Sequence, residues 1–139
     1  MRRLLFKLVS AIHVFVYRLT GGKFGGEIRG FQLLLLTTTG RKTGEKRTIP
    51  LGYFAHDGGY VIIGSNAGSD SHPAWFRNLR GQPRATIQVK KRRFEVSAKT
   101  AQGDERRRLW ARLMEVAPGY ANYANRTSRE IPLVILRPA

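Results

Sequence analysis

Cysteine is absent from the 139 residues, which excludes disulfides, thiolate metal sites and a cysteine nucleophile. Histidine is scarce: His13, His56 and His72 do not make a zinc-like cluster without cysteine, so no metal site is expected. The sequence has neither the spacing of a Walker phosphate loop nor a G-x-S-x-G nucleophile elbow. If the protein is an enzyme, we expect a bound cofactor to supply the chemistry.

Acidic residues are also few. The chain has 9 Asp and Glu against 25 Lys and Arg, which gives a net charge of +16 at pH 7. Such an excess predicts an anionic partner of one of three classes: nucleic acid, anionic lipid or a phosphorylated ligand. General solubilising charge is the alternative. The apolar fraction of 42% and the chain length are typical of one globular domain with its own core.

Residues 1–20 are predicted to form an amphipathic helix. Its apolar residues recur at steps of three and four and are Leu4, Leu5, Leu8, Ile12, Phe15, Val16 and Leu19. Its basic residues are Arg2, Arg3, Lys7 and Arg18. The apolar run is too short for a membrane span, and no small-residue cleavage site follows it. Such a helix lies in the interface of an anionic membrane, packs on its own domain, or does both.

The remaining chain divides into a glycine-rich linker at residues 21–30 and a cofactor-binding domain at residues 31–139. Strands are predicted at 31–38, 48–56, 60–65, 84–90, 93–99 and 131–136. One helical turn is expected after Pro73 and a longer helix after Asp104. Many short strands with few helices indicate a mainly β fold with some α, arranged as a small antiparallel barrel or roll.

The loop from Thr38 to Arg47 is the most specific local feature. Gly40 and Gly44 permit tight turns that expose backbone N–H groups. Arginine, lysine and threonine surround them, at Thr38, Thr39, Arg41, Lys42, Thr43, Lys46 and Arg47. Converging N–H groups, guanidinium forks and lysine point charges are what phosphate binding requires. The loop is therefore predicted to hold a polyanion, with a solvated basic turn as the alternative.

Two further segments are candidates for ligand contact. Small residues at 64–68 end a strand and allow a ligand to approach closely, and a helix beginning near Pro73 offers its N-terminus to an anion or a ring carbonyl. Trp75 offers a flat face to an aromatic ring, unless Trp75 and Phe76 belong to the core. In the segment Tyr120 to Tyr123, the tyrosines cap a pocket, donate hydrogen bonds and pass on a proton, or only pack on the barrel.

Four stretches, taken together, resemble the deazaflavin (coenzyme F420)-dependent nitroreductases and F420H2-dependent quinone reductases of actinobacteria. The stretches are TTTGRKTGEKRTIPLGY, VIIGSNAGSDSHPAWFRNLRGQPRATIQV, PGYANY and TSREIPLVIL. The resemblance implies a split β-barrel related to FMN-binding proteins, and hydride transfer from reduced F420 to a menaquinone-like quinone. It also implies a cytoplasmic protein held peripherally on the inner face of the membrane through residues 1–20, without nucleic acid.

Alternatives to this interpretation are an FMN-type oxidoreductase on the same barrel and a non-catalytic module that binds F420, lipid or nucleic acid. Whether the protein is a monomer or a homodimer stays open. The resemblance also assigns residues. Arg41, Lys42 and Thr43 would meet the cofactor phosphate and acidic tail. A continuing wall would consist of Arg47, Thr48, Ile49, Pro50, Leu51 and Gly52. The deazaflavin ring and its side chain would be lined by Ile63, Gly64, Ser65, Asn66, Ala74, Trp75, Phe76, Arg77 and Asn78.

The resemblance further places Tyr120 over the ring with Tyr123 nearby, and Ser65 where it can hydrogen-bond the substrate. These three are the candidate catalytic residues, for substrate positioning or proton donation. Gly52 and Ala117 stand where the nitroimidazole-reducing member of the family carries tyrosines. Their small size is expected to open the substrate side of the pocket. This difference argues against nitroimidazole activation and leaves cofactor binding intact.

Overall fold

Six antiparallel strands close into a barrel in the computed structural model, which describes residues 2–23, 26–28 and 31–139, without the side chains of residues 2–4, 27 and 28. The strands are β2 (Phe31–Thr39), β3 (Lys46–His56), β4 (Gly59–Ile63), β5 (Arg84–Val89), β6 (Arg92–Thr100) and β7 (Leu133–Pro138). Their order is β2-β3-β4-β7-β6-β5, and pairing of β2 with β5 closes the ring. A short strand, β1 (Glu27–Ile28), extends β2. The antiparallel barrel predicted from the sequence is confirmed.

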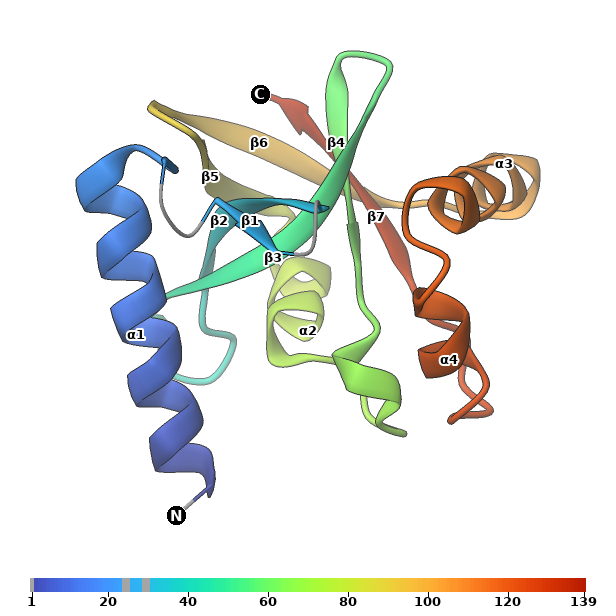
Figure 1. The fold of residues 1–139 in the computed structure, drawn as a ribbon, viewed down its shortest axis with the longest axis horizontal. Coiled ribbons are helices and arrows are strands. Elements are labelled where there is room, and N and C mark those ends of the chain that lie inside the picture. Colours follow the sequence, from blue (N-terminus) through green and yellow to red (C-terminus); the bar gives the residue numbers. More distant parts are fainter. Residues whose placement is uncertain (1, 24–25, 29–30) are drawn as a thin grey trace.

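Helices surround the barrel on three sides (Figure 1). They are α1 (Arg2–Thr20), α2 (Ala74–Gly81), α3 (Gly103–Val116) and α4 (Tyr120–Ala124), with a 3-10 turn, η1, at Asn66–Gly68. Helix α1 runs along one side, α3 and α4 lie on the opposite side, and α2 lies between them below the barrel. The sequence did not predict α4 as a helix, because five residues are too few to display helical periodicity.

The apolar run of β2 is buried on both faces, as its lack of alternation predicts. Leu34 and Leu36 point into the barrel and join the interior core, into which α2 inserts Trp75. On the outer face, Leu35 packs under α1. A second core lies between the other side of the barrel and helices α3 and α4, with Leu113 fully buried in it. The barrel is thus packed inside and partly covered outside.

Helix α1 is fixed to the barrel through Tyr17, which is 1% exposed. The Tyr17 hydroxyl donates to the Leu33 carbonyl oxygen at 3.1 Å and accepts from the Lys90 backbone N–H at 2.8 Å. Val14, three residues earlier, packs beside it on Leu35. The helix ends where Gly22 N–H donates to the Tyr17 carbonyl oxygen at 2.9 Å with a φ of 79°, a left-handed conformation that favours glycine.

Most of the apolar residues that marked α1 in the sequence lie on a different face from Val14 and Tyr17, whereas Val16 is half-buried. The exposed large apolar side chains of the helix are 55–74% exposed and are Leu5, Phe6, Leu8, Val9, Ile12, Phe15 and Leu19. The side chain of Leu4, which was predicted on the apolar face, and those of the basic residues Arg2 and Arg3 lie outside the described residues. No helix in the described ranges is long and apolar enough to cross a membrane. The helix therefore packs on its domain through one face and presents its apolar face to solvent.

Candidate functional site

The loop between β2 and β3 is a compact turn with outward side chains. Gly40 N–H donates to the Glu45 carbonyl oxygen at 2.7 Å, and Gly44 N–H donates to the Gly40 carbonyl oxygen at 2.8 Å. Gly44 has a φ of 76°, which a side chain would disfavour. The Thr43 hydroxyl accepts from Glu45 N–H at 3.2 Å. With its backbone held internally, the loop exposes every side chain from Arg41 to Arg47.

Asn78 on α2 supports this loop from behind. Its side-chain oxygen accepts from the backbone N–H of Arg41 at 3.2 Å and from Arg41 Nη1 at 3.1 Å. Its side-chain nitrogen donates to Thr38 Oγ1 at 3.0 Å. Asn78 is only 4% exposed, and its side chain is occupied by these contacts, so that its direct contact with a ligand stays a prediction. Asn78 positions Arg41, and the other guanidinium N–H groups of Arg41 have no partner among the residues that the structure describes, so they can meet an anion.

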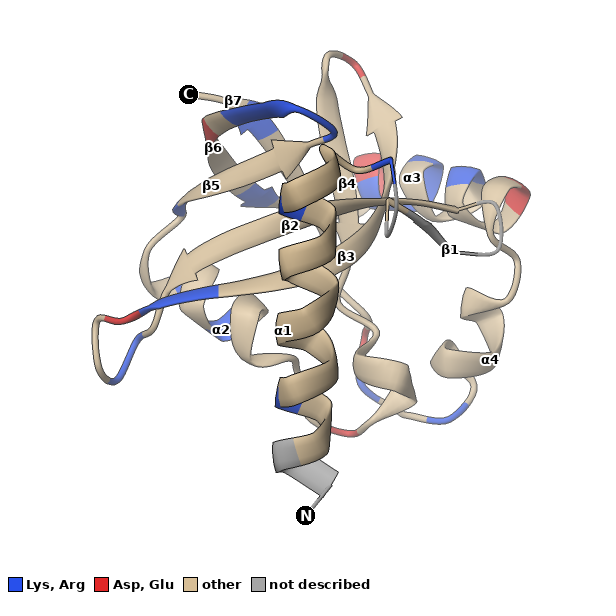
Figure 2. Ribbon diagram, turned by 60° about the vertical axis from the view of Figure 1, so that its left-hand side comes forward, with Lys and Arg blue, Asp and Glu red and all other residues tan. Residues whose placement is uncertain are grey.

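Positive charge dominates the loop, which projects at the left of Figure 2. Its one acid, Glu45, forms an exposed ion pair with Arg47 at 3.3 Å. Lys46 Nζ donates to Thr39 Oγ1 at 2.9 Å. Arg41 and Lys42 have no acidic partner in the described part of the chain. This donor set fits a phosphate or carboxylate group, because guanidinium forks and ammonium groups stand exposed with few competing acids.

The predicted wall from Arg47 to Gly52 is split by the pleat of β3. Side chains alternate along a strand, and the Ile49 and Leu51 side chains pack against the interior core, so these two side chains face into the barrel. Thr48, on the outer face, shares a hydrogen bond of 2.8 Å with Thr37 and accepts from Arg18 Nη2 of α1 at 3.3 Å. Thr48 therefore anchors α1. Of the predicted residues, Pro50 and Gly52 remain on the outer face of β3, where a ligand could lie.

Gly52 does not open the pocket as the sequence suggested. A Cβ built at position 52 would lie 2.4 Å from Phe31 Cε1 and 3.3 Å from the Tyr120 hydroxyl oxygen. Phe31 is a diagonal neighbour on the same face of the β2–β3 pair, since Leu33 stands opposite Gly52. Its ring fills the space that a side chain at position 52 would take.

Tyr120 and Tyr123 form an aromatic group with Phe31. Ring centroids are 6.0 Å apart for Phe31 and Tyr120, and 5.7 Å apart for Tyr120 and Tyr123, both edge-on. Burial, with a smaller contribution from Tyr123, raises the pKa of Tyr120 above its ordinary value. The phenol therefore stays protonated at neutral pH. Its hydroxyl has no hydrogen-bond partner among the described residues, so it is available to a ligand.

The loop after β4 holds three consecutive residues in the left-handed region. The φ angles are 45° at Asn66, 54° at Ala67 and 78° at Gly68. For residues with a Cβ this conformation is strained, and such strain persists only where surrounding contacts fix it. Ser65 is nearly buried, and its hydroxyl makes no capping hydrogen bond to η1. Ile63 and Gly64, which were predicted to line a ring, are instead covered by the outer core and by Pro132.

Arg129 supplies the contacts that hold this loop, and the sequence analysis did not identify it. Its Nε donates to the Ser69 carbonyl oxygen at 2.8 Å, its Nη1 to the Gly64 carbonyl oxygen at 3.1 Å, and its Nη2 to the Ser65 carbonyl oxygen at 2.8 Å. Nη1 also lies 3.1 Å from His72 Nδ1. Nothing local in the sequence signals this role, because the partners lie 57–65 residues away along the chain.

Helix α2 contributes its outer face to the site. Trp75 and Phe76 are 6% and 5% exposed in the interior core, so the core alternative left open by the sequence holds for both rings. Their contact with a ligand ring stays a prediction. Ala74 is exposed and Arg77 half-exposed, which agrees with one helical turn between outward positions.

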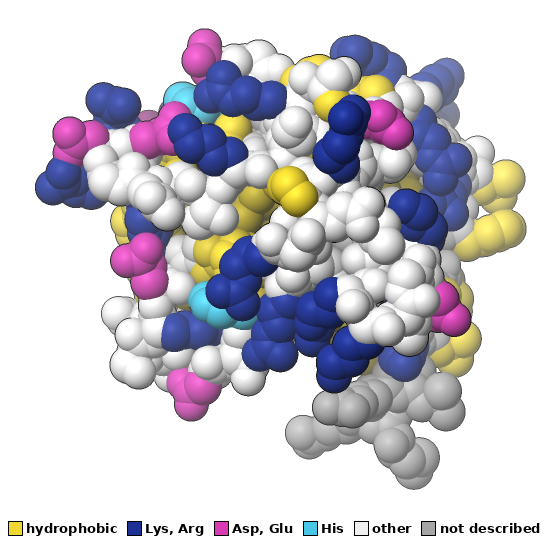
Figure 3. Space-filling model, turned by 180° about the vertical axis from the view of Figure 1, so that it is seen from behind, with side chains coloured by type: hydrophobic (Ala, Val, Ile, Leu, Met, Phe, Trp, Pro, Cys, Tyr) yellow, Lys and Arg dark blue, Asp and Glu magenta, His cyan; other side chains and the backbone are white. Residues whose placement is uncertain are grey.

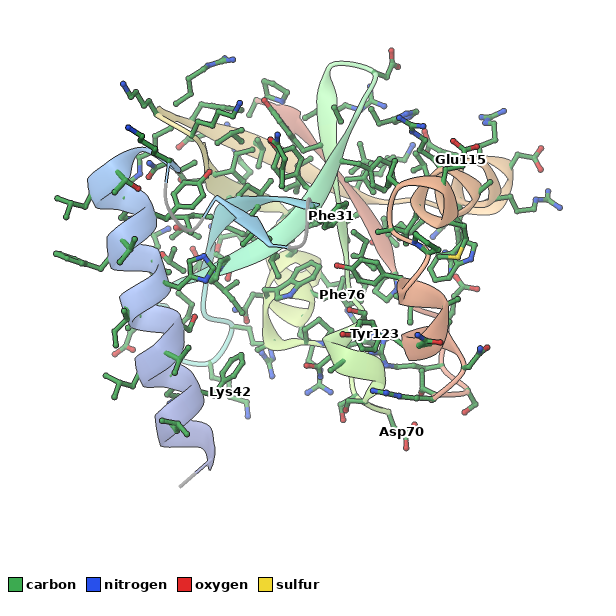
Figure 4. The ribbon with its side chains drawn as sticks, viewed as in Figure 1. Phe31, Lys42, Asp70, Phe76, Glu115 and Tyr123 are labelled. Carbon is green, nitrogen blue, oxygen red and sulfur yellow. The ribbon has the colours of Figure 1, made fainter. Side chains whose placement is uncertain are left out.

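The basic loop and the aromatic group of Phe31, Tyr120 and Tyr123 are connected by one strand, β3. Figure 4 shows Lys42 on the α1 side, Tyr123 on the α4 side and Phe31 between them. Strand β3 connects the two groups from Arg47 to Gly52, and at about 3.3 Å per residue this distance is roughly 17 Å. Among the described residues no cluster of acids and histidines could hold a metal ion. The arrangement suits an elongated ligand that has an acidic tail at one end and an aromatic ring at the other.

Comparisons with known proteins identify the family of this chain. A sequence model of the F420H2-dependent quinone reductase family matches residues 9–138. An F420H2-dependent quinone reductase of Mycobacterium tuberculosis is 41% identical over 129 residues, which cover 90% of this chain and 87% of the relative. A solved F420H2-dependent reductase superposes with a TM-score of 0.69 at 34% identity, covering 76% of this chain and 93% of that one.

A second solved structure, described as a domain-swapped dimer, superposes with a TM-score of 0.72 at 30% identity and covers 91% of this chain and 96% of that chain. The barrel, the basic loop and the extent of these matches lead to one conclusion: the chain belongs to the F420H2-dependent quinone reductase family.

Proposed function

We propose that this protein binds reduced coenzyme F420 and transfers its hydride to a quinone. The observation that carries the proposal is the placement of an exposed basic loop and of the aromatic group of Phe31, Tyr120 and Tyr123 along one strand, about 17 Å apart on β3. Such a site holds the acidic tail and the ring of one cofactor at once. The family to which the chain belongs supports the same cofactor and acceptor.

The residues present fit F420. Arg41, Lys42 and Thr43 would hold its phosphate and acidic tail, with Asn78 fixing the Arg41 side chain. Arg77 adds charge from α2. Bound F420H2 supplies a hydride, and the redox chemistry belongs to the cofactor. The contribution of the protein is then to bind and orient two rings and to limit their motion.

Three groups are candidates for the source of the proton that the acceptor takes up: Tyr120, Ser65 and water. A quinone becomes a hydroquinone when it takes up one hydride and one proton. A phenol is protonated at neutral pH even at its ordinary pKa of about 10, and burial raises the pKa of Tyr120 further, so Tyr120 can donate a hydrogen bond to a quinone oxygen. The proton itself comes from Tyr120, from the Ser65 hydroxyl or from water. Tyr123 would support the Tyr120 ring by its edge contact.

The same residues argue for quinones over nitroimidazoles. Phe31 occupies the space at position 52 with an apolar ring, and Ala117 is small and packed against the outer core. The two tyrosine hydroxyls that the nitroimidazole-reducing member of the family would carry at positions 52 and 117 are thus missing here. A flat, apolar acceptor needs fewer hydrogen bonds than a nitro compound, so we expect quinone reduction to be the faster reaction.

Membrane attachment through α1 forms part of the proposal. The apolar face from Leu5 to Leu19 points away from the barrel, and in Figure 3 apolar side chains protrude at the right-hand edge, where α1 lies. An exposed apolar helix face of this kind is typical of interfacial membrane binding. The protein would then work on the inner face of the cell membrane, where lipid-soluble quinones lie.

A cofactor titration followed by turnover tests the catalytic part. We expect F420 to bind more tightly than FMN, and F420H2 to be oxidised faster with menadione than with a bicyclic nitroimidazole. Tyr120→Phe should lower kcat for menadione about tenfold or more if its hydroxyl assists proton transfer. Tighter binding of FMN, or no quinone turnover, would overturn the proposal.

The membrane part needs a variant that leaves the packing face intact. Changing Leu8, Ile12 and Phe15 to serine removes exposed apolar area and keeps Val14 and Tyr17 on the barrel. We expect this variant to leave the membrane fraction while its F420 affinity stays unchanged. Val116→Ser, at an exposed apolar position on α3, is the control. A triple variant that remains in the membrane fraction would refute the role of this face.

A further inference from the structure

We propose that the turn between β5 and β6, made of Lys90, Lys91, Arg92 and Arg93, is a binding site for anionic phospholipid headgroups. It would act together with the apolar face of α1 and fix how the protein lies on the membrane. This inference rests on the proposed membrane attachment. It adds a second contact point, whose first residue, Lys90, lies 73 residues from Tyr17 of the helix in the sequence.

The turn lies against the C-terminal end of α1. Lys90 N–H donates to the Tyr17 hydroxyl at 2.8 Å, and a Cβ at Gly21 would lie 2.6 Å from Lys91 Cγ. Leu19, the most exposed apolar residue of the helix at 74%, is two residues from Gly21. Figures 1 and 2 both show the turn beside the end of α1 that is remote from the N-terminus. The basic turn and the exposed apolar face of α1 are therefore adjacent.

The charge of this turn is not compensated within the protein. All four side chains are exposed, and none forms an ion pair with any residue that the structure describes. The acid closest in sequence, Glu95, is paired with Arg84 at 3.3 Å. Arg18 of α1 is a fifth cation near this turn. Its pKa is lowered by burial and, to a smaller extent, by the charge of Arg93. Like charges gathered in this way favour an external anion.

The backbone of the turn does not explain its lysines. Val89 pairs with Arg92, so Lys90 and Lys91 are the two turn residues of the hairpin. Lys90 has a φ of 56°, and two-residue hairpin turns prefer glycine, asparagine or aspartate at such a position. A lysine there is less favourable for folding than glycine would be. Its charge is therefore the feature that the turn presents.

A lipid surface matches this arrangement better than nucleic acid does. The cations adjoin a strip of exposed Leu, Ile and Phe side chains, which nucleic acid would leave uncovered. Apolar side chains of this kind bury among the acyl chains, and lysine and arginine bind the anionic headgroups above them. Attachment at the helix and at the turn prevents rotation about the helix axis. The basic loop and the aromatic group of the candidate site would then keep one fixed orientation relative to the membrane.

Vesicle binding by two charge-matched variants tests the inference. The first changes Lys90, Lys91, Arg92 and Arg93 to glutamine, and the control changes Lys99, Arg107, Arg108 and Arg112 to glutamine on and near α3, across the barrel. Both lose four charges. On vesicles containing phosphatidylglycerol, we expect the turn variant to bind at least tenfold more weakly than the unchanged protein, and the control to lose less. On pure phosphatidylcholine all three should bind alike, and F420 affinity should not change.

The outcomes separate this inference from the proposed function. If the turn variant binds phosphatidylglycerol vesicles as well as the unchanged protein does, the headgroup site is refuted while membrane attachment by α1 stands. If the unchanged protein binds neither kind of vesicle, both proposals fail. Equal losses in the two variants would show a general charge effect and would also refute the site. Binding of duplex DNA that the turn variant loses, without vesicle binding, would assign the turn to nucleic acid instead.

Discussion

Phe31 and Gly52 depend on each other: the ring of Phe31 lies where a side chain at position 52 would stand, 2.4 Å from an added Cβ. The aromatic lining of this part of the site thus comes from β2, across the strand pair, and not from position 52 itself. Tyr120 completes the contact from α4 at 6.0 Å from the Phe31 ring. Three segments distant in sequence meet at one point.

Gly52→Ala should destabilise the fold, because the added methyl group meets a packed ring. Overpacking of this kind costs about 1–3 kcal/mol, measurable as a lower urea midpoint. Phe31→Ala would recover part of that loss when combined with Gly52→Ala, since it removes the ring. Gly58→Ala is the wrong control, because its φ is 78°; Gly119→Ala is suitable, with a φ of −58° and open space around it. A Gly52→Ala protein of unchanged stability would contradict this packing.

Asn78→Ala should weaken F420 binding although Asn78 is buried. The substitution removes both hydrogen bonds that hold Arg41, so the guanidinium loses its fixed position. We expect the Kd for F420 to rise about tenfold, the magnitude of one lost charge-assisted hydrogen bond. Arg41→Gln should have a similar effect, and the double variant little more. Additive effects, which would mean that the two residues act separately, would contradict the positioning role. Arg108→Gln is the control.

Arg129→Lys should lower kcat and leave F420 affinity nearly unchanged. Lysine keeps the charge but cannot replace a fork that holds the carbonyl oxygens of Gly64, Ser65 and Ser69. Leaving such groups without partners costs about 1–3 kcal/mol, and the strained residues after Ser65 would relax. Hydrogen exchange should rise in this loop. Arg137→Lys, at an exposed position on β7, should change neither. Normal exchange in Arg129→Lys would show that the loop does not need the fork.

Stability should fall as the pH drops below the ordinary histidine pKa of 6.5. Burial, with the charges of Arg129, Arg80 and Arg77, lowers the pKa of His72 below that value in the folded protein. As the pH falls, the unfolded chain therefore binds a proton on His72 before the folded chain does, which favours unfolding. Above pH 6.5 His72 is neutral in both states, and no such loss occurs. His72→Asn should flatten the dependence of Tm on pH between 7 and 5, and an unchanged dependence in this variant would contradict the role of His72.

Some features followed directly from the sequence. The uninterrupted apolar run of β2 predicted a strand covered on both sides, and Leu34, Leu35 and Leu36 are buried on both faces. The basic loop from Arg41 to Arg47 is exposed as its composition predicts. Each of these properties depends on residues adjacent in the chain, so local periodicity and turn chemistry were enough.

Other features were decided by the tertiary structure. The apolar face of α1 points outward because Tyr17, and not that face, finds hydrogen-bond partners on β2 and at Lys90. The side chains of Ile49 and Leu51 point inward, away from the predicted cofactor-binding surface, because the pleat of β3 turns them toward the core once the barrel closes. Arg129 reaches carbonyl oxygens 60 to 65 residues away. Strand register and barrel closure fix such contacts, and no local pattern in the sequence records them.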